Sequence, residues 1–324
     1  MQRRPNVVLW GAGMAAGVHG SACQSLGWPI VGVASRQAER ARTLAKTLNT
    51  HAVSYDDVLG ERLTEIVIVT TPPACHLADT KRLLDVGYHV VVESPLSCTL
   101  ADADLLIEAE QQAGRPVLYS EHLTAAPTID GLLSRVAGMG HVTHLSARAI
   151  RRAPTWRSSN IDEWGGGVLF DLGVHPIALL LRAADVAGLG APTSVTATMT
   201  PAAATAQVHF ESGTVARLTV GWQPDVDPSG DLQVSSAQAV LRVDLYPMPT
   251  LEFNGDPVRL DSEPSSPATF LNDYGYGPQL RRFREAAPCR RSNSGMRPTP
   301  RHRPHEQCTQ LARASLIVED MAYA

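Results

Sequence analysis

An aspartate and a histidine are the residues of this chain best spaced for proton transfer. Asp171 and His175 are four residues apart in the segment GGGVLFDLGVH, so on an α-helix they share one face. A carboxylate beside an imidazole can fix the tautomer of the ring and raise its basicity, as a proton-transferring histidine requires. The alternative is a core histidine that is simply hydrogen-bonded. Pro176 predicts a kink or break just after the histidine.

A second candidate site is the glycine-containing turn near the start of the chain. GAGMAA follows the apolar run NVVLW and fits the pattern G-x-G-x-x-G/A in the strand–turn–helix setting that the pattern requires. Gly11 permits the tight turn, Gly13 lets the backbone approach a pyrophosphate, and Ala16 lets helix and strand pack closely. Backbone donors at the helix start would face the phosphates. The pattern predicts a dinucleotide site; the alternative is a tight turn without a ligand.

The end of the second predicted strand indicates which dinucleotide is bound. An acidic residue there would bind the ribose 2′-hydroxyl of NAD, but this chain has Ser35 and Arg36, with Arg40 one turn later. A hydroxyl and two guanidinium groups suit a 2′-phosphate, because charge-assisted bonds to phosphate are strong. We therefore expect NADP(H) in preference to NAD(H). The alternative is that the arginines extend along the surface at a helix start.

A third group of polar residues follows the apolar strand HVVVE. The chain passes from this strand into Glu93, Ser94 and Pro95, and ligands bind where parallel strands end. Ser94 is either a group that donates to a ligand or a turn hydroxyl that bonds nearby backbone.

These residues must be positioned by strands and helices that alternate along the chain. Short apolar runs alternate with segments of helical periodicity in the first 120 residues, which is typical of βαβ units. After residue 123 the apolar residues alternate at period two, which predicts an antiparallel sheet. We expect an α/β chain: a doubly wound parallel sheet in an N-terminal Rossmann domain over residues 1–122, and an α+β domain over residues 123–324 for substrate binding and oligomerisation, with an open, mostly antiparallel sheet. The expected parallel strands are 6–10, 29–35, 65–71, 89–93 and 116–120.

Charge and strand pattern limit the partners. The net charge is −4, which argues against nucleic acid or an anionic membrane surface and leaves a small-molecule substrate. The strands of residues 193–246 can be covered by helices on one face only. We expect the open face to join subunits into a homodimer or homotetramer through an apolar interface.

Location and metal binding also follow from composition and spacing. The five cysteines are scattered singly, which suits reduced thiols in the cytoplasm, and no run approaches the ~20 apolar residues of a membrane span. No metal is expected, because His141 and His144 would point to opposite faces of a strand, while His302 and His305 lie in a basic coil. That coil, residues 288–305, is expected to be an exposed loop. Trp156 and Trp164 are expected to pack, with a pocket wall as the alternative.

Together these segments resemble the Gfo/Idh/MocA family of NAD(P)-dependent oxidoreductases. The matching segments are VVLWGAGMAAGVHG, VASR, VTTPPACHLADT, HVVVESPLS and GGGVLFDLGVH. The resemblance implies that Thr71, Pro72 and His76 line the cofactor. It also implies that Glu93 and Pro95 lie near the nicotinamide. The full set of expected cofactor-binding residues is Gly11, Ala12, Gly13, Met14, Ala15, Ser35, Arg36, Arg40, Thr71, Pro72, His76, Glu93 and Pro95.

This chain departs from the family pattern at its reactive positions. The family usually has the sequence Glu-Lys-Pro at this point, and Ser94 replaces the lysine of that motif. Family members that oxidise sugars use this lysine together with an aspartate and a histidine, which Asp171 and His175 match. Ala178 stands where many sugar dehydrogenases continue H-x-x-D. Thr124-Ala125 stand where Arg-Phe is common. These changes remove contacts that a polyol would use.

The leading hypothesis is an NADP(H)-dependent oxidoreductase. His175, oriented by Asp171, would exchange a proton with a hydroxyl, carbonyl or imine substrate, and Ser94 would donate one hydrogen bond. The alternatives are an NADP-binding protein without redox turnover, acting as a sensor or inactive partner subunit, and a redox-neutral enzyme with a retained nicotinamide.

Overall fold

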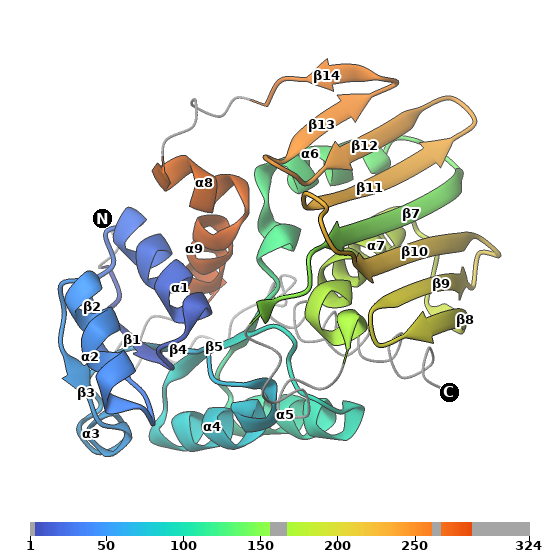
Figure 1. Cartoon of the computed structure of the whole chain (residues 1–324). Helices are drawn as coiled ribbons and strands as arrows, with labels where there is room; N and C mark the ends of the chain where they lie inside the picture. Colours follow the sequence, from blue (N-terminus) through green and yellow to red (C-terminus); the bar gives the residue numbers. More distant parts are fainter. Residues whose placement is uncertain (1–3, 156–166, 261–266, 287–324) are drawn as a thin grey trace, which may run out of the picture.

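The computed structural model describes residues 4–155, 167–260 and 267–286 (Figure 1). Outside these ranges lie Trp156, Trp164, His302, His305 and the whole basic segment 288–305.

The first sheet is built from six short parallel strands. Runs such as VVLW and IVIV are buried on both faces, as expected when helices cover both sides of a parallel sheet. The order β3-β2-β1-β4-β5-β6 reverses direction between β1 and β4, and ligands bind at the carboxyl ends of the strands beside such a reversal. The expected doubly wound sheet is confirmed, and sequence analysis missed only the two-residue β3. The strands are β1 (Val7–Trp10), β2 (Ile30–Ala34), β3 (Ala52–Val53), β4 (Ile66–Val69), β5 (His89–Glu93) and β6 (Val117–Ser120).

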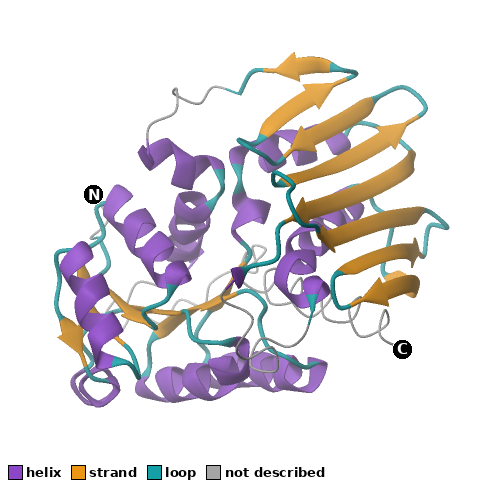
Figure 2. Ribbon diagram, viewed as in Figure 1, coloured by secondary structure: helices purple, strands orange, loops and turns teal. Residues whose placement is uncertain are grey.

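Five helices connect these strands and lie on both sides of the sheet (Figure 2). Local signals set their ends: the Thr99 side chain accepts a hydrogen bond from the Asp102 N–H and caps the last helix. Gly87 and Gly114 end two of the helices in the left-handed conformation, which glycine adopts without strain. The helices are α1 (Met14–Ser25), α2 (Ala38–Thr47), α3 (Tyr55–Glu61), α4 (Pro73–Val86) and α5 (Leu100–Ala113).

The second sheet has eight strands in the order β14-β13-β12-β11-β7-β10-β9-β8. Every neighbouring pair is antiparallel except β7 with β10, so the predicted mostly antiparallel sheet is confirmed. Helices α6 (Pro127–Val136) and α7 (Val174–Val186) cover one face. The strands are β7 (Val142–Arg151), β8 (Pro192–Thr200), β9 (Ala203–Phe210), β10 (Val215–Trp222), β11 (Ser229–Ser236), β12 (Val240–Asp244), β13 (Thr250–Phe253) and β14 (Asp256–Val258).

The outer face of this sheet is mostly polar. In β9 and β10 the buried side chains alternate with exposed ones, which leaves residues such as Gln207 and Arg217 outside. Asp231 lies between Arg148 and Arg242, at 2.8 and 3.3 Å, in an ion-pair network on this face. Polar and charged side chains thus occupy much of the face at which an apolar subunit interface was expected. A homodimer or homotetramer through this face stays a prediction.

Two late helices return to the first domain. Helices α8 (Pro267–Asp273) and α9 (Tyr276–Ala286) lie beside α1 (Figure 1). Leu280 and Phe283 of α9 pack in the same buried cluster as Leu9 and Ile68 of the parallel sheet. Residues of α9 therefore contribute to the core of the first domain, while Tyr274, between α8 and α9, packs in the core of the second. The division of the chain at residue 122 stays a prediction. Apolar residues at helical spacing show that a helix is buried, but not against which sheet.

Candidate functional site

The turn after β1 has the shape that a dinucleotide phosphate requires. Gly11 has φ +128°, and a Cβ there would lie 2.3 Å from the Thr70 side-chain oxygen, so no other residue fits between β1 and β4. At Gly13, by contrast, an added Cβ would meet no atom within 4 Å, and no side chain caps α1. There is thus open space at Gly13, where α1 begins, beside Ala12, Met14 and Ala15. These features fit a pyrophosphate bound at the helix start.

Ser35, Arg36 and Arg40 lie where β2 ends and α2 begins. The Ser35 hydroxyl accepts a hydrogen bond from the Gln37 N–H at 3.2 Å. Both arginines are exposed, and neither forms an ion pair with a residue of the described ranges. Their guanidinium groups are available to a phosphate at this end of the sheet.

The loops after β4 and β5 are tied together by His76. One ring nitrogen, Nε2, lies 2.7 Å from the Thr71 carbonyl oxygen, and Nδ1 lies 3.1 Å from the carbonyl oxygens of Pro95 and Leu96. Burial lowers the pKa of this histidine. His76 thus fixes the position of one loop relative to the other. Thr71 and Pro72 lie partly buried just before α4.

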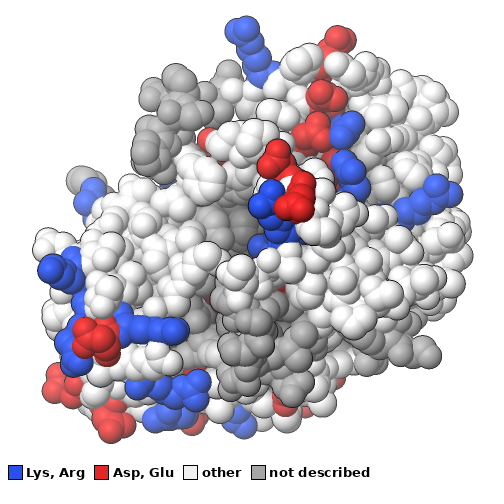
Figure 3. All heavy atoms as spheres, in the orientation of Figure 1, with Lys and Arg blue, Asp and Glu red and all other residues white. Residues whose placement is uncertain are grey.

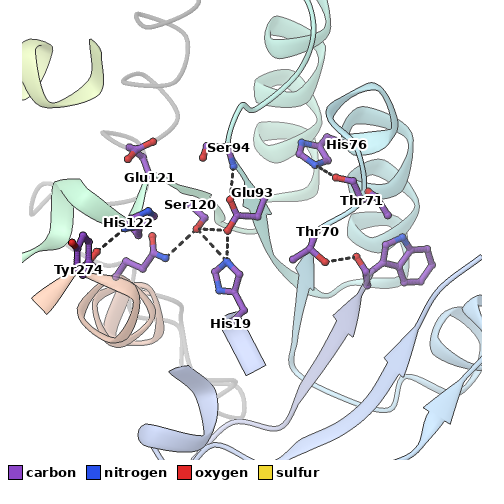
Figure 4. A network of polar contacts seen from close by, with 12 residues as sticks. His19, Thr70, Thr71, His76, Glu93, Ser94, Ser120, Glu121, His122 and Tyr274 are labelled. Carbon is purple, nitrogen blue, oxygen red and sulfur yellow. Dashed lines mark hydrogen bonds and ion pairs between the residues drawn. The ribbon is translucent and has the colours of Figure 1, made fainter. Parts of the chain in front are cut away.

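A buried polar network surrounds Glu93 (Figure 4). Its Oε1 lies 2.5 Å from Nε2 of His19 in α1, and its Oε2 accepts a hydrogen bond from the Ser94 backbone N–H at 2.9 Å. Ser120 lies 3.5 Å from both members of the pair and accepts a hydrogen bond from Gln279 of α9. Burial acts to raise the pKa of Glu93, but the hydrogen bond and charge of His19 outweigh it, so this pKa is lowered.

His175 is held by a glutamate that the sequence analysis did not identify. Its Nδ1 lies 2.9 Å from each carboxylate oxygen of Glu121, which directly follows β6. The Glu121 side chain is 1% exposed and that of His175 is 23% exposed. Burial acts to lower the pKa of His175, but the charge and hydrogen bond of Glu121 raise it above its ordinary value.

Asp171 has other hydrogen-bond partners. It accepts hydrogen bonds from Arg151 at 2.5 Å and from the Trp222 indole at 3.1 Å, and contributes only a small charge effect to His175. Both partners come from the second sheet: Arg151 ends β7 and Trp222 ends β10. Leu169–Gly173, which contain Asp171, form a π-helical turn, η4.

The predicted break after His175 is also misplaced. Pro176 lies in the first turn of α7, where proline is tolerated, and the helix continues to Val186. The distortion is the π-helical turn that precedes the histidine.

Three site residues had been overlooked: His19, Glu121 and His122. Glu121 and His122 directly follow β6, and Glu93 is the last residue of β5, so the same strand-end argument would have found them. His19 has no such signal, because a lone histidine in a helix is usually only a packed residue.

Other kinds of site find no support in the described ranges. No group of three His, Cys, Asp or Glu side chains there is arranged to hold a metal ion. No described helix has the length and apolarity to cross a membrane. On the face shown in Figure 3, basic and acidic side chains are interspersed.

The fold and this strand-end site define a class of dinucleotide-binding oxidoreductase. Residues 5–121 match the family description "Oxidoreductase family, NAD-binding Rossmann fold", and residues 137–238 match the "GFO/IDH/MocA C-terminal domain". The chain belongs to the Gfo/Idh/MocA family.

Individual relatives agree with this assignment. The chain is 32% identical over 162 residues to an uncharacterized oxidoreductase of Rhizobium meliloti, and 34% identical over 156 residues to dTDP-3,4-didehydro-2,6-dideoxy-alpha-D-glucose 3-reductase of Streptomyces violaceoruber. The matches span about half of this chain (47% and 45%) and about half of each relative (47% and 44%). The solved structure of GenD2 from gentamicin A biosynthesis, in complex with NAD, has a TM-score of 0.81 at 21% identity, covering 100% of this chain and 94% of that one. That likeness shows the shared fold.

Proposed function

We propose that this protein is an NADP(H)-dependent oxidoreductase that acts on a hydroxyl or carbonyl carbon of a sugar-like small molecule. The observation that carries the proposal is the His175–Glu121 pair, in which a buried carboxylate holds the ring through Nδ1. Nε2 of His175 bonds no described residue and is not among the buried unpartnered atoms. It is therefore accessible to a substrate.

The chemistry of the pair follows from its hydrogen bond. An ionised carboxylate only accepts, so Nδ1 of His175 carries a hydrogen, and Nε2 is the atom that gains or releases the transferred proton. The raised pKa keeps a proton on the ring to higher pH, so His175 can protonate a carbonyl oxygen as it is reduced, and can take the proton back in the reverse direction. Glu121 stabilises the charged ring and fixes its orientation.

The cofactor site is formed by the ends of β1, β2, β4 and β5. Gly11 and Gly13 would admit the pyrophosphate, and Arg36 and Arg40 would bind a 2′-phosphate. A bound nicotinamide dinucleotide supplies or accepts the hydride at the substrate carbon. Ser94 presents a hydroxyl where related enzymes have a lysine ammonium, so the charge on the reacting oxygen is met mainly by His175.

The substrate class is proposed from the relatives. The named relative from Streptomyces violaceoruber is a sugar 3-reductase, and the accessible histidine suits reduction of a sugar ketone. The complex of GenD2 with NAD concerns that protein; for this chain, the two unpaired arginines after β2 favour NADP(H).

The test is consumption of NADPH and of NADH with a panel of keto sugars. Turnover of at least one keto sugar, faster with NADPH at equal concentration, is expected. A protein that binds NADPH by calorimetry but reduces no member of the panel would instead match the second candidate, a dinucleotide-binding protein without redox turnover. That candidate is favoured by Ser94 at the position of the family lysine.

A further inference from the structure

A second imidazole, His122, lies beside His175 and takes no part in the proposed proton transfer. It opens the short helix η1 (His122–Ala125) directly after Glu121. The two imidazole rings have centroids 5.5 Å apart at 56°. Any molecule that reaches Nε2 of His175 therefore comes within a few ångströms of His122.

The ring of His122 is fixed in position and in tautomer. Its Nδ1 lies 2.7 Å from the carbonyl oxygen of Tyr274, and its face stacks on Tyr276 with centroids 4.0 Å apart. A carbonyl oxygen only accepts, so Nδ1 must carry the hydrogen. In the neutral ring, Nε2 is then a lone-pair acceptor.

The backbone that holds this ring is itself tightly placed. Gly275 has φ +85°, and a Cβ there would lie 1.9 Å from the His122 carbonyl oxygen, so the two backbones touch. The Tyr274 hydroxyl lies 2.9 and 2.8 Å from the carbonyl oxygens of Leu245 and Pro247. His122 therefore cannot turn away from this position without moving the segment between α8 and α9.

The two neighbouring rings are pushed toward opposite charge states. Burial lowers the pKa of His122, and the nearby His175 lowers it further, against the charge of Glu121. The pKa of His175 is raised. Environments that separate two neighbouring groups in this way assign them different roles: His175 is the proton donor, and His122 is a neutral acceptor.

Nε2 of His122 has no partner within the described ranges, and it is not among the buried polar atoms that lack one. The ring is partly buried. This acceptor is thus available to a ligand, on a ring whose centroid lies 5.5 Å from that of His175.

We infer that His122 determines specificity: its Nε2 accepts a hydrogen bond from a hydroxyl on the carbon next to the reacting carbon. This inference rests on the proposed function and narrows its substrate class to α-hydroxy ketones and the vicinal diols formed from them. A hydroxyl can donate this hydrogen bond, whereas a carbonyl or an ether at the same place cannot. A substrate that lacks this hydroxyl leaves Nε2 of His122 without a hydrogen bond. Binding sites discriminate strongly against substrates that leave a polar group unpaired.

The test uses methyl 3-keto-α-D-glucopyranoside and its 2-deoxy and 4-deoxy analogues with NADPH. Wild type is expected to prefer the fully hydroxylated ketone over one of the two analogues by about 10- to 100-fold in kcat/KM. His122→Asn keeps a donor near the Nδ1 position but has no acceptor at Nε2, so the preference should fall to within about threefold of unity. His122→Gln can place an amide oxygen near the Nε2 position and should retain most of the preference.

A separate measurement keeps this inference distinct from the proposed function. Methyl α-D-glucopyranoside and its deoxy analogues are titrated into the NADPH complex, in which no reaction can occur. A preference for the hydroxylated glycoside that His122→Asn abolishes supports the inference even if no ketone is reduced, which would refute only the proposed activity. Equal affinities in wild type, or an unchanged preference in His122→Asn, overturn the inference.

Discussion

Two histidine–carboxylate pairs lie at the ends of neighbouring parallel strands and differ in what can reach them. In the first, His175 with Glu121, the ring is 23% exposed and its Nε2 is accessible. In the second, His19 with Glu93, the ring is fully buried and its Nδ1 has no partner among the described residues. The chemical groups are the same, so the difference between the proposed proton donor and a structural contact lies in the exposure of the ring.

The second pair connects secondary-structure elements. His19 belongs to α1, Glu93 ends β5, and Gln279 of α9 reaches the same network through Ser120. The network therefore holds together three parts of the first domain. This comparison predicts that variants of the first pair lose activity and variants of the second lose stability.

The largest effect is expected for His175→Ala. Loss of the proton donor should lower NADPH-linked turnover by about 100-fold or more, since general acid–base groups contribute ~10²–10⁴. The dissociation constant for NADPH and the melting temperature should change little. Steady-state kinetics and calorimetry measure these quantities, with the exposed His51→Ala as matched control. Turnover equal to wild type would show that another residue carries the proton.

Glu121→Gln should lower turnover by a smaller factor, about 10-fold, because the ring remains in place but its charged form loses the carboxylate. Reduction requires protonated His175, so kcat/KM should fall as pH rises through its raised pKa. Without the carboxylate that raises this pKa, the fall should begin at lower pH. Glu108→Gln, at an exposed position, is the control. An unchanged pH profile would contradict the role of Glu121 as a positioning residue.

His19→Ala tests whether the second pair contributes to stability rather than to activity. Removing the partner of a largely buried carboxylate should lower the free energy of unfolding by about 1–3 kcal/mol. Turnover per folded molecule should change far less than in His175→Ala. Denaturant unfolding and kinetics on one preparation decide this. A stable variant that has lost its turnover would make His19 part of the proton path.

The smallest effect is expected at the cofactor end. Arg36→Ala should weaken NADPH binding by about 0.2–1 kcal/mol, the strength of a solvent-exposed ion pair, and leave NADH binding unchanged. Lys46→Ala, at the far end of the same helix, is the control. Calorimetric titration with both nucleotides is the measurement, and an unchanged preference for NADPH would refute the assignment of Arg36.

Much of the fold could be predicted from the sequence, because it depends on local patterns. The apolar runs predicted the parallel strands, and glycines such as Gly87 and Gly114 stand at helix ends. Each of these signals depends on only a few neighbouring residues. The glycine turn was predicted for the same reason. The parallel pairing of β7 with β10, and the return of α8 and α9, depend on contacts between distant segments.

The candidate site was predicted only in part. His175 was singled out by its spacing from Asp171, but the Asp171 carboxylate bonds Arg151 and Trp222 of the second sheet. The carboxylate that bonds His175 comes from position 121, 54 residues earlier. No periodicity within one segment can indicate a pairing over that separation.

The return of α8 and α9 to the parallel sheet has a consequence for synthesis on the ribosome. The first domain is interrupted: its sheet is complete by residue 120, but Leu280 and Phe283 must still pack against it. Domains fold as units while the chain emerges from the N-terminus. Leu9 and Ile68 therefore gain these packing partners only after the second domain has been synthesised. The first domain begins to fold first, but its core is completed last.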